Sequence, residues 1–153
     1  MNLTDILDVA QIVPDLQSRG KHEVMEELCR PIIARRPDLR AEALLQVLIE
    51  RERLGSTGIG DGIAIPHGKV PGLDQLLVSF GRSVQGVDFD SLDAKPAHLF
   101  FLVLAPEDSA GAHLKALARI SRMLKSNTIR EELMAAGDSQ DIYEIFSRQE
   151  EEI

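Results

Sequence analysis

Between Ser18 and Arg36 the hydrophobic residues fall in adjacent pairs that recur every four positions. The pairs are Val24/Met25, Leu28/Cys29 and Ile32/Ile33. This spacing puts the apolar side chains on one face of an α-helix, so it predicts a helix that packs on a core. Pro31 lies inside the pattern, and proline removes an amide donor and crowds the preceding turn. We therefore expect a kink or a break near Arg30.

A second stripe at helical spacing comprises Leu44, Leu45 and Leu48. Asp38 can act as the N-cap of this helix, and Gly55 is typical of the residue that ends one. Shorter apolar segments then predict β-strands at Ile63 and Ile65, over 76–80 and over 99–104. The last segment is apolar at both alternations, as expected of a central strand covered by helices on both faces.

Three helices are predicted after this central strand. Ser109 can cap the first, whose buried stripe is expected to be Leu114, Leu117, Ala118, Ser121 and Leu124. The second ends at Ala136, before Gly137. Asp138 and Asp141 resemble a capping box for the third, which is expected to bury Ile142, Ile145 and Phe146.

The order of these elements, with helices before and after a group of strands, predicts an α/β or α+β fold with a small mixed β-sheet flanked by helices on both faces. A length of 153 residues and a hydrophobic fraction of 44% fit a single domain over 1–153. The net charge of −8 argues against a protein that binds nucleic acid through its phosphates.

The sequence also indicates in which cellular compartment the protein is expected. The longest apolar run, 99–105, is far shorter than the roughly 20 residues that a membrane span requires, so no membrane insertion is expected. The amino terminus is acidic and resembles no signal peptide, which predicts a cytoplasmic protein. The single cysteine, Cys29, permits neither an internal disulfide nor a cysteine zinc cage, and its place on the helical stripe predicts a core residue.

The glycine-rich segment 58–69 fits no nucleotide-binding motif. A P-loop has four residues before its Gly-Lys pair, whereas Gly62 and Gly68 enclose five, and Val70 stands where Ser or Thr is needed. The dinucleotide fingerprint requires a third glycine where Ile63 stands.

The same segment instead presents His67 at the end of a short predicted strand, between Pro66 and Gly68. An imidazole with a pKa of about 6.5 is largely neutral at cellular pH, so one ring nitrogen can attack an electrophile while the backbone holds the other. A phosphoryl group is a fitting electrophile. The alternative is a structural histidine at a strand terminus, and the residues alone do not decide between the two.

Residues 52–68 resemble the active-site pattern of the fructose/mannitol-type IIA domains of the bacterial phosphotransferase system. The pattern is an acidic residue, six spacers, Ile59-Gly60, two spacers and then Ile-Ala-Ile-Pro-His-Gly over 63–68. The flanking residues 54–60 and 62–69 are most similar to the nitrogen-regulatory branch (EIIA-Ntr). The resemblance extends over nearly the whole chain and implies a phosphotransferase component with no small-molecule turnover of its own, no cofactor and no metal.

The resemblance implies that His67 is the phosphorylated histidine, with Arg51 and His113 as the other site residues. An acidic site residue found in some members of the family aligns with Asp61. His67 would take phosphoryl from a phosphohistidine on a small carrier protein, HPr or its nitrogen-branch counterpart. In sugar-transporting members the group then passes to a cysteine of a IIB domain.

Physical chemistry supports these roles without requiring them. A guanidinium at Arg51 can bind phosphate with two parallel hydrogen bonds, and His113 falls in the first turn of a predicted helix, whose dipole favours an anion. Without the resemblance, Arg51 and His113 would be solvated helix residues and Asp61 a turn-former. His98 is expected at the rim of its strand, and Arg35, Arg36 and Arg82 are expected to face water.

Several functions remain open at this point. A phosphocarrier with regulatory output is the main hypothesis, and a regulatory module that binds targets in its unphosphorylated form is compatible with it. A sugar-specific IIA component, encoded as a separate chain, is the alternative. A zinc hydrolase built from His67, His113 and Asp61 is disfavoured, because no two histidines have helical ligand spacing. A docking carrier predicts an exposed apolar surface around His67.

Overall fold

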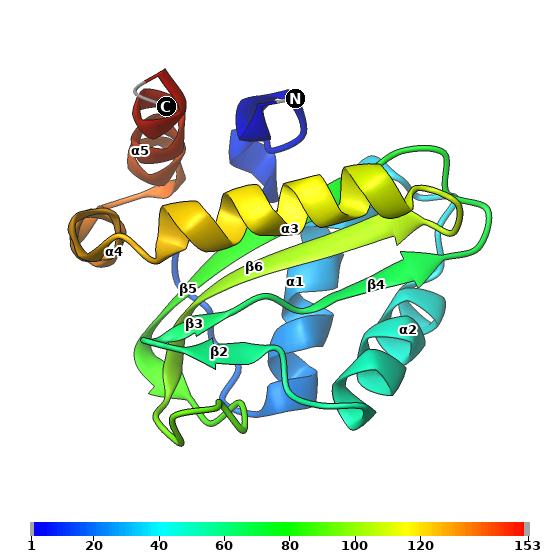
Figure 1. The fold of residues 1–153 in the computed structure, drawn as a ribbon, viewed down its shortest axis with the longest axis horizontal. Helices are drawn as coiled ribbons and strands as arrows, with labels where there is room; N and C mark the ends of the chain where they lie inside the picture. Colours follow the sequence, from blue (N-terminus) through cyan, green and yellow to red (C-terminus); the bar gives the residue numbers. More distant parts are fainter. Residues whose placement is uncertain (1, 152–153) are drawn as a thin grey trace.

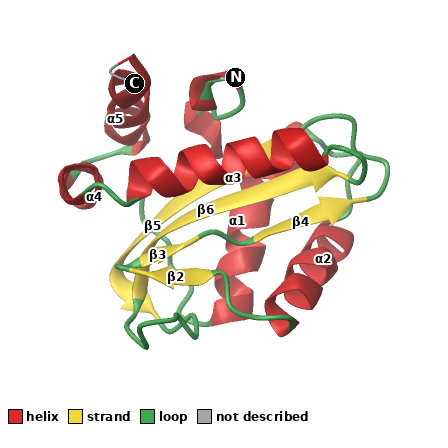
Figure 2. Ribbon diagram, viewed as in Figure 1, coloured by secondary structure: helices red, strands yellow, loops and turns green. Residues whose placement is uncertain are grey.

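Six β-strands form one mixed sheet within residues 2–151, the part of the chain that the computed structural model describes, and helices cover both faces (Figures 1 and 2). The strands are β1 (Ile12–Val13), β2 (Gly58–Gly60), β3 (Ile63–Ala64), β4 (His67–Val70), β5 (Leu77–Val87) and β6 (Ala97–Pro106). The helices are α1 (Lys21–Arg35), α2 (Ala41–Arg53), α3 (Ala110–Leu124), α4 (Asn127–Ala135) and α5 (Ser139–Glu151), after 3₁₀ turns at Leu3–Asp5 and Val9–Gln11. The predicted class is confirmed.

Strand β6 lies at the centre of the sheet, whose order is β1-β5-β6-β3-β2. It pairs antiparallel with β5 on one side. On the other side it pairs in parallel first with β3 and then, further along, with β4. The short strands β1, β2 and β4 were not predicted, because two to four residues give too little alternation to detect.

Side chains of β6 alternate between two hydrophobic cores, as the predicted central strand requires. Leu99, Phe101 and Val103 pack with residues of α3, α4 and α5 on one face. Phe100, Leu102 and Leu104 pack with residues of α1 and α2 on the other. Figure 1 shows α3 crossing one face of the sheet while α1 and α2 lie on the opposite face.

Helix α1 runs through Pro31 without a break, so the predicted interruption near Arg30 is wrong. Leu28 and Ile32, on either side of the proline, are both buried, and their burial in the core outweighs the backbone hydrogen bond that proline cannot make. Helix α2 starts later than predicted, with Arg40 as its N-cap, because the Asp38 carboxylate binds the Arg36 guanidinium instead.

Helix α3 buries a different face from the predicted one. His113, Ala116, Ile120 and Met123 are buried, whereas Leu114 is 64% exposed and Ala118 is also exposed. Leu124 alone of the predicted stripe is fully buried. The rotation turns His113 towards the sheet, which the apolar pattern could not reveal because the pattern counted histidine as polar.

Arg82 is buried at 6% exposure, contrary to the expectation that it faces water. Its guanidinium donates to the carbonyls of Pro14 (2.9 Å), Leu133 (2.9 Å) and Ala136. The bonds to Leu133 and Ala136 satisfy carbonyls at the end of α4 that have no partner within the helix. The predicted capping box of α5 is confirmed, since Asp141 N donates to Asp138 Oδ1 at 2.9 Å and Asp138 N to Asp141 Oδ2 at 3.4 Å.

Candidate functional site

His67 is the first residue of β4, where it pairs with Val103 of β6. The sequence placed it at the end of a strand; the structure shows it opening one, because Pro66 separates β4 from β3. The next residue must be glycine: a Cβ on Gly68 would lie 2.5 Å from Val47 Cγ1 of α2. The bare backbone at Gly68 therefore lets α2 pack against β4 on the face opposite His67.

The His67 ring is half-buried, and its Nδ1 lies 2.7 Å from the carbonyl oxygen of Ile65. A carbonyl can only accept a hydrogen bond, so Nδ1 carries the hydrogen and donates it. In the neutral ring Nε2 then holds the lone pair. The backbone thus fixes both the tautomer and the orientation of a nucleophilic imidazole.

His113 lies beside His67, with ring centroids 5.5 Å apart and planes tilted by 49°. It belongs to the first turn of α3, and its amide donates to the Ser109 carbonyl at 2.9 Å. The side chain is buried, and its Nδ1 has no hydrogen-bond partner among the described residues. The structure therefore brings together two histidines that the sequence separates by 46 positions.

Burial lowers the pKa of His67 below its ordinary value, and the positive charge of Arg51 adds to this effect. The hydrogen bond to Ile65 and the negative charge of Glu52 act in the opposite direction without reversing it. Burial also lowers the pKa of His113, helped by the neighbouring His67 and Lys69. Both rings are therefore neutral at neutral pH, the state in which an imidazole is a nucleophile.

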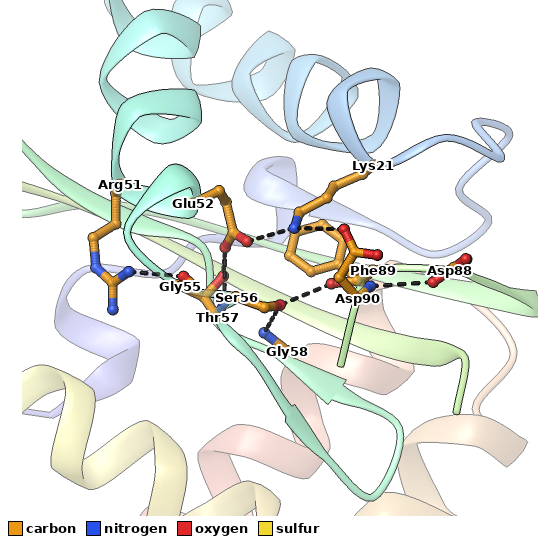
Figure 3. Close-up of polar contacts among 10 residues, drawn as sticks. All are labelled: Lys21, Arg51, Glu52, Gly55, Ser56, Thr57, Gly58, Asp88, Phe89 and Asp90. Atoms are coloured by element: carbon orange, nitrogen blue, oxygen red, sulfur yellow. Dashed lines mark hydrogen bonds and ion pairs between the residues drawn. The ribbon is translucent and has the colours of Figure 1, made fainter. Parts of the chain in front are cut away.

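Arg51 stands near the C-terminus of α2, and its Nη1 donates to the Gly55 carbonyl at 2.9 Å (Figure 3). That bond holds the guanidinium in place and leaves its other N–H groups available. The effect of Arg51 on the pKa of His67 puts the two groups within electrostatic range. Arg51 and His113 thus belong to α2 and α3, helices that pack on opposite faces of the sheet.

Asp61 is not brought to this site. It occupies the turn between β2 and β3 with a φ of 58°, and its amide donates to Asp93 Oδ2 at 3.0 Å. Ile63 pairs with Leu99 while His67 pairs with Val103, four residues or about 13 Å further along β6. The turn-forming interpretation fits Asp61, and we leave it out of the site.

His98 and Cys29 also lie apart from His67. The Nδ1 of His98 donates to the Ser83 carbonyl at 2.9 Å, and its Cδ2 lies close to Gly62 at the far end of β6. A cavity of about 500 Å³ at that end is lined in part by Asp61, His98 and Met134. Cys29 is buried in the core, which raises the pKa of its thiol to about 12.

The sequence did not identify three groups that shape the site. The Ile65 carbonyl orients His67, the positive charge of Lys69 helps to lower the pKa of His113, and the side chain of Glu52, the residue after Arg51, is buried. In the sequence, Glu52 appeared only as the first residue of the family pattern. The Ile65 carbonyl could not be predicted, because a backbone group leaves no signal in a sequence. Within residues 2–151 no cluster of three or more His, Cys, Asp or Glu side chains is placed to hold a metal, and no helix is long and apolar enough to cross a membrane.

The chain is similar to known proteins over nearly its full length. Residues 5–149 match the family described as "Phosphoenolpyruvate-dependent sugar phosphotransferase system, EIIA 2". A nitrogen regulatory protein of Bradyrhizobium diazoefficiens is 40% identical over 150 residues, covering 96% of this chain and 95% of the relative. The fructose-specific EIIA component of Haloferax volcanii is 35% identical over 153 residues, covering 96% of this chain and 97% of the relative. The crystal structure of IIA-Ntr from Neisseria meningitidis superposes with a TM-score of 0.87 at 35% identity, covering 93% of this chain and 97% of that one.

Proposed function

The chain belongs to the EIIA 2 family of the phosphoenolpyruvate-dependent sugar phosphotransferase system, and on that premise we propose that it carries a phosphoryl group on Nε2 of His67. One observation carries the assignment. The bond from Nδ1 to the Ile65 carbonyl leaves Nε2 as the nucleophilic nitrogen of a half-buried ring. His113 and Arg51 flank that ring.

In the proposed step, the lone pair on Nε2 of His67 attacks phosphorus as the N–P bond of a donor phosphohistidine breaks. The donor ring, protonated on its other nitrogen, keeps the electron pair of that bond and leaves as a neutral imidazole. The hydrogen on Nδ1 stays in place, because the Ile65 carbonyl accepts it throughout. The ring becomes more positive as the N–P bond forms, and the carbonyl oxygen stabilises that charge.

Arg51 and His113 stabilise the phosphoryl group in this proposal. The group brings close to two negative charges, which the free N–H groups of the guanidinium are suited to bind. His113 contributes a second donor, and the positive end of the α3 dipole reinforces it. Because Arg51 is already held by Gly55, little ordering is needed when phosphate arrives.

The donor that we propose is a small carrier protein bearing phosphohistidine, either HPr or its nitrogen-branch counterpart. Two exposed leucines neighbour the site residues in the chain: Leu54, 85% exposed, directly after α2, and Leu114, 64% exposed, next to His113. They provide the apolar docking surface expected of a protein that receives a group from another protein. We propose that the protein acts in the cytoplasm and turns over no small molecule of its own.

The proposed output is regulatory, through the phosphorylation state of His67. Support comes from the nitrogen regulatory relatives, which match this chain over nearly its full length. The fructose-specific relative supports a second candidate, transfer of phosphoryl to a cysteine of a IIB domain. A complex of a related IIA and a phosphorylated IIB is known for mannitol.

Phosphopeptide mapping tests the proposal. The protein is incubated with phosphoenolpyruvate, enzyme I and each kind of carrier. We expect an acid-labile, base-stable phosphoryl group on the peptide that contains His67, and none in the folded His67→Ala variant. Labelling of that variant would contradict the assignment. The His22→Ala variant, which removes an exposed histidine outside the site, is the control and should be labelled normally.

A further inference from the structure

Glu52 follows Arg51 in the chain, but its side chain points away from solvent into a buried polar network. The residue is only 8% exposed. Oε1 accepts hydrogen bonds from the amide of Thr57 (2.9 Å) and from its hydroxyl, and Oε2 lies 2.8 Å from Nζ of Lys21 (Figure 3). Burial of a carboxylate is costly unless such partners compensate it, so this arrangement is a specific one.

Lys21 extends the network to a second loop. Its ammonium lies 3.2 Å from Asp90 Oδ2 and 5.0 Å from the centroid of the Phe89 ring. Burial by itself would lower the pKa of Lys21, but the hydrogen bonds to Glu52 and Asp90 raise it overall. The hydroxyl of Ser56 donates to the Phe89 carbonyl at 2.8 Å, so the loop after α2 is fastened to the loop after β5.

Two hydrogen-bond paths lead from this network to the site. Glu52 and Thr57 close the loop that contains Gly55, whose carbonyl holds the Arg51 guanidinium. The Thr57 carbonyl accepts from the amide of Ile65 at 3.0 Å, and the Ile65 carbonyl in turn holds Nδ1 of His67. The bonds of the second path do not involve the carboxylate itself, so the buried carboxylate braces chiefly the Arg51 guanidinium.

We infer that Glu52 is a positioning residue, which fixes Arg51 relative to His67 by holding the loop 54–58 between Thr57 and Lys21. The inference rests on the proposed function, because it assumes that phosphoryl reaches His67 and that Arg51 binds it. A purely structural role would contribute to folding without a specific effect through Arg51. The two roles predict different effects of a Glu52 substitution on the phosphorylation rate when Arg51 has already been replaced. A positioning role predicts that the effect is largely lost, and a purely structural role predicts that it persists.

A double-mutant cycle separates these roles. The measured quantity is the rate of phosphorylation of His67 by phosphoramidate, a small donor that needs no docking surface, followed by ³¹P NMR. We expect Glu52→Gln to slow the reaction by about 10-fold with Arg51 present, and by less than about 3-fold in an Arg51→Ala background. Thr57→Val, which weakens the same clamp from its other end, should act in the same direction.

Matched controls exclude trivial explanations. Glu50→Gln makes the same chemical change at an exposed position of α2 and should leave the rate unaltered. Cooperative urea unfolding verifies that each variant is folded; if Glu52→Gln is not, Thr57→Val replaces it in the cycle. Equal slowing by Glu52→Gln in both backgrounds, or no slowing, overturns the inference while the proposed function stands. Phosphorylation that persists in His67→Ala would instead overturn the proposed function.

Discussion

At the level of single residues, the site depends on a backbone carbonyl as much as on side chains. The family pattern in the sequence identified His67, and the flanking Pro66 and Gly68 indicated that it is presented. Its tautomer, however, is set by Ile65, whose carbonyl no sequence pattern marks. For Asp61 the structure favours the turn-forming alternative, because the strand between it and His67 runs along β6, which sequence distance does not reveal.

The lowered pKa of His67 predicts how phosphorylation depends on pH. Above the ordinary histidine pKa of about 6.5 the ring is already neutral, so the rate with phosphoramidate should, after correction for ionisation of the donor, be flat. It should fall only at lower pH, where the ring takes up a proton. Titration of the His67 ring protons by NMR gives the pKa directly, and a value above that of a free histidine would contradict this prediction.

The same shift has a consequence for stability. Between the lowered pKa of folded His67 and about 6.5, the unfolded chain binds more protons than the folded one. The free energy of unfolding should therefore decline as pH falls through this window, and His113 should add to the decline. Urea unfolding at several pH values should show a weaker decline in His67→Gln than in the wild type. An equal decline in both would mean that His67 does not contribute.

Substitution of Arg51 by lysine tests whether the geometry of the guanidinium matters beyond its charge. Lysine cannot make two parallel hydrogen bonds to phosphate or keep the fixed fork that Gly55 now orients. We expect Arg51→Lys to slow phosphorylation by about 10-fold and Arg51→Ala by about 100-fold, with the fold intact. Arg53→Lys, on an exposed neighbour, should have no effect. A wild-type rate in Arg51→Lys would assign the effect to charge alone.

At the level of elements, apolar periodicity located most of the helices but not always their buried faces. In α3 the stripe through Leu114 competed with a second one through Ala116 and Ile120, and contact with the sheet selected the latter. In α1 the burial of Leu28 and Ile32 overrode the proline. Local signals were sufficient where the interaction itself is local, as in the capping box of Asp138 and Asp141.

Arg82 provides a stability prediction at this level, because it joins β5 to the end of α4. Arg82→Met would remove the donors to the carbonyls of Pro14, Leu133 and Ala136, and would leave the buried Leu133 carbonyl without a partner. We expect a loss of about 3 kcal/mol in the free energy of unfolding. Arg35→Met breaks an exposed ion pair with Asp8 and should cost less than about 1 kcal/mol. Urea unfolding measures both losses, and a similar loss of unfolding free energy in Arg82→Met and Arg35→Met would contradict this prediction.

At the level of the whole molecule, the sequence predicted that helices cover both faces of the sheet, but it did not predict the order of the strands. An uninterrupted apolar β6 already indicated helices on both faces. That β3 and β4 pair in turn with the same edge of β6 depends on contacts between distant segments, which periodicity does not encode. This arrangement places His67 in a sheet that α2 and α3 cover from opposite faces.

The regulatory output makes a prediction about the intact protein. Once phosphorylated, it should retain its phosphoryl group when a fructose-type or mannitol-type IIB domain and the corresponding sugar are added. The measurement is loss of label from His67 over time, with a sugar-specific IIA protein as the positive control. Rapid passage of the label to the sugar would support the alternative function instead.

The most direct measurement is the identity of the phosphorylated nitrogen. Phosphorylated protein with ¹⁵N-labelled histidine is recorded by long-range ¹H–¹⁵N NMR, in which an imidazole nitrogen bonded to phosphorus is distinguished from one bonded to hydrogen. The structure predicts phosphorus on Nε2 of His67 and hydrogen on Nδ1, held by the Ile65 carbonyl. Phosphorus on Nδ1 of His67, or on any other histidine, would contradict the proposed site.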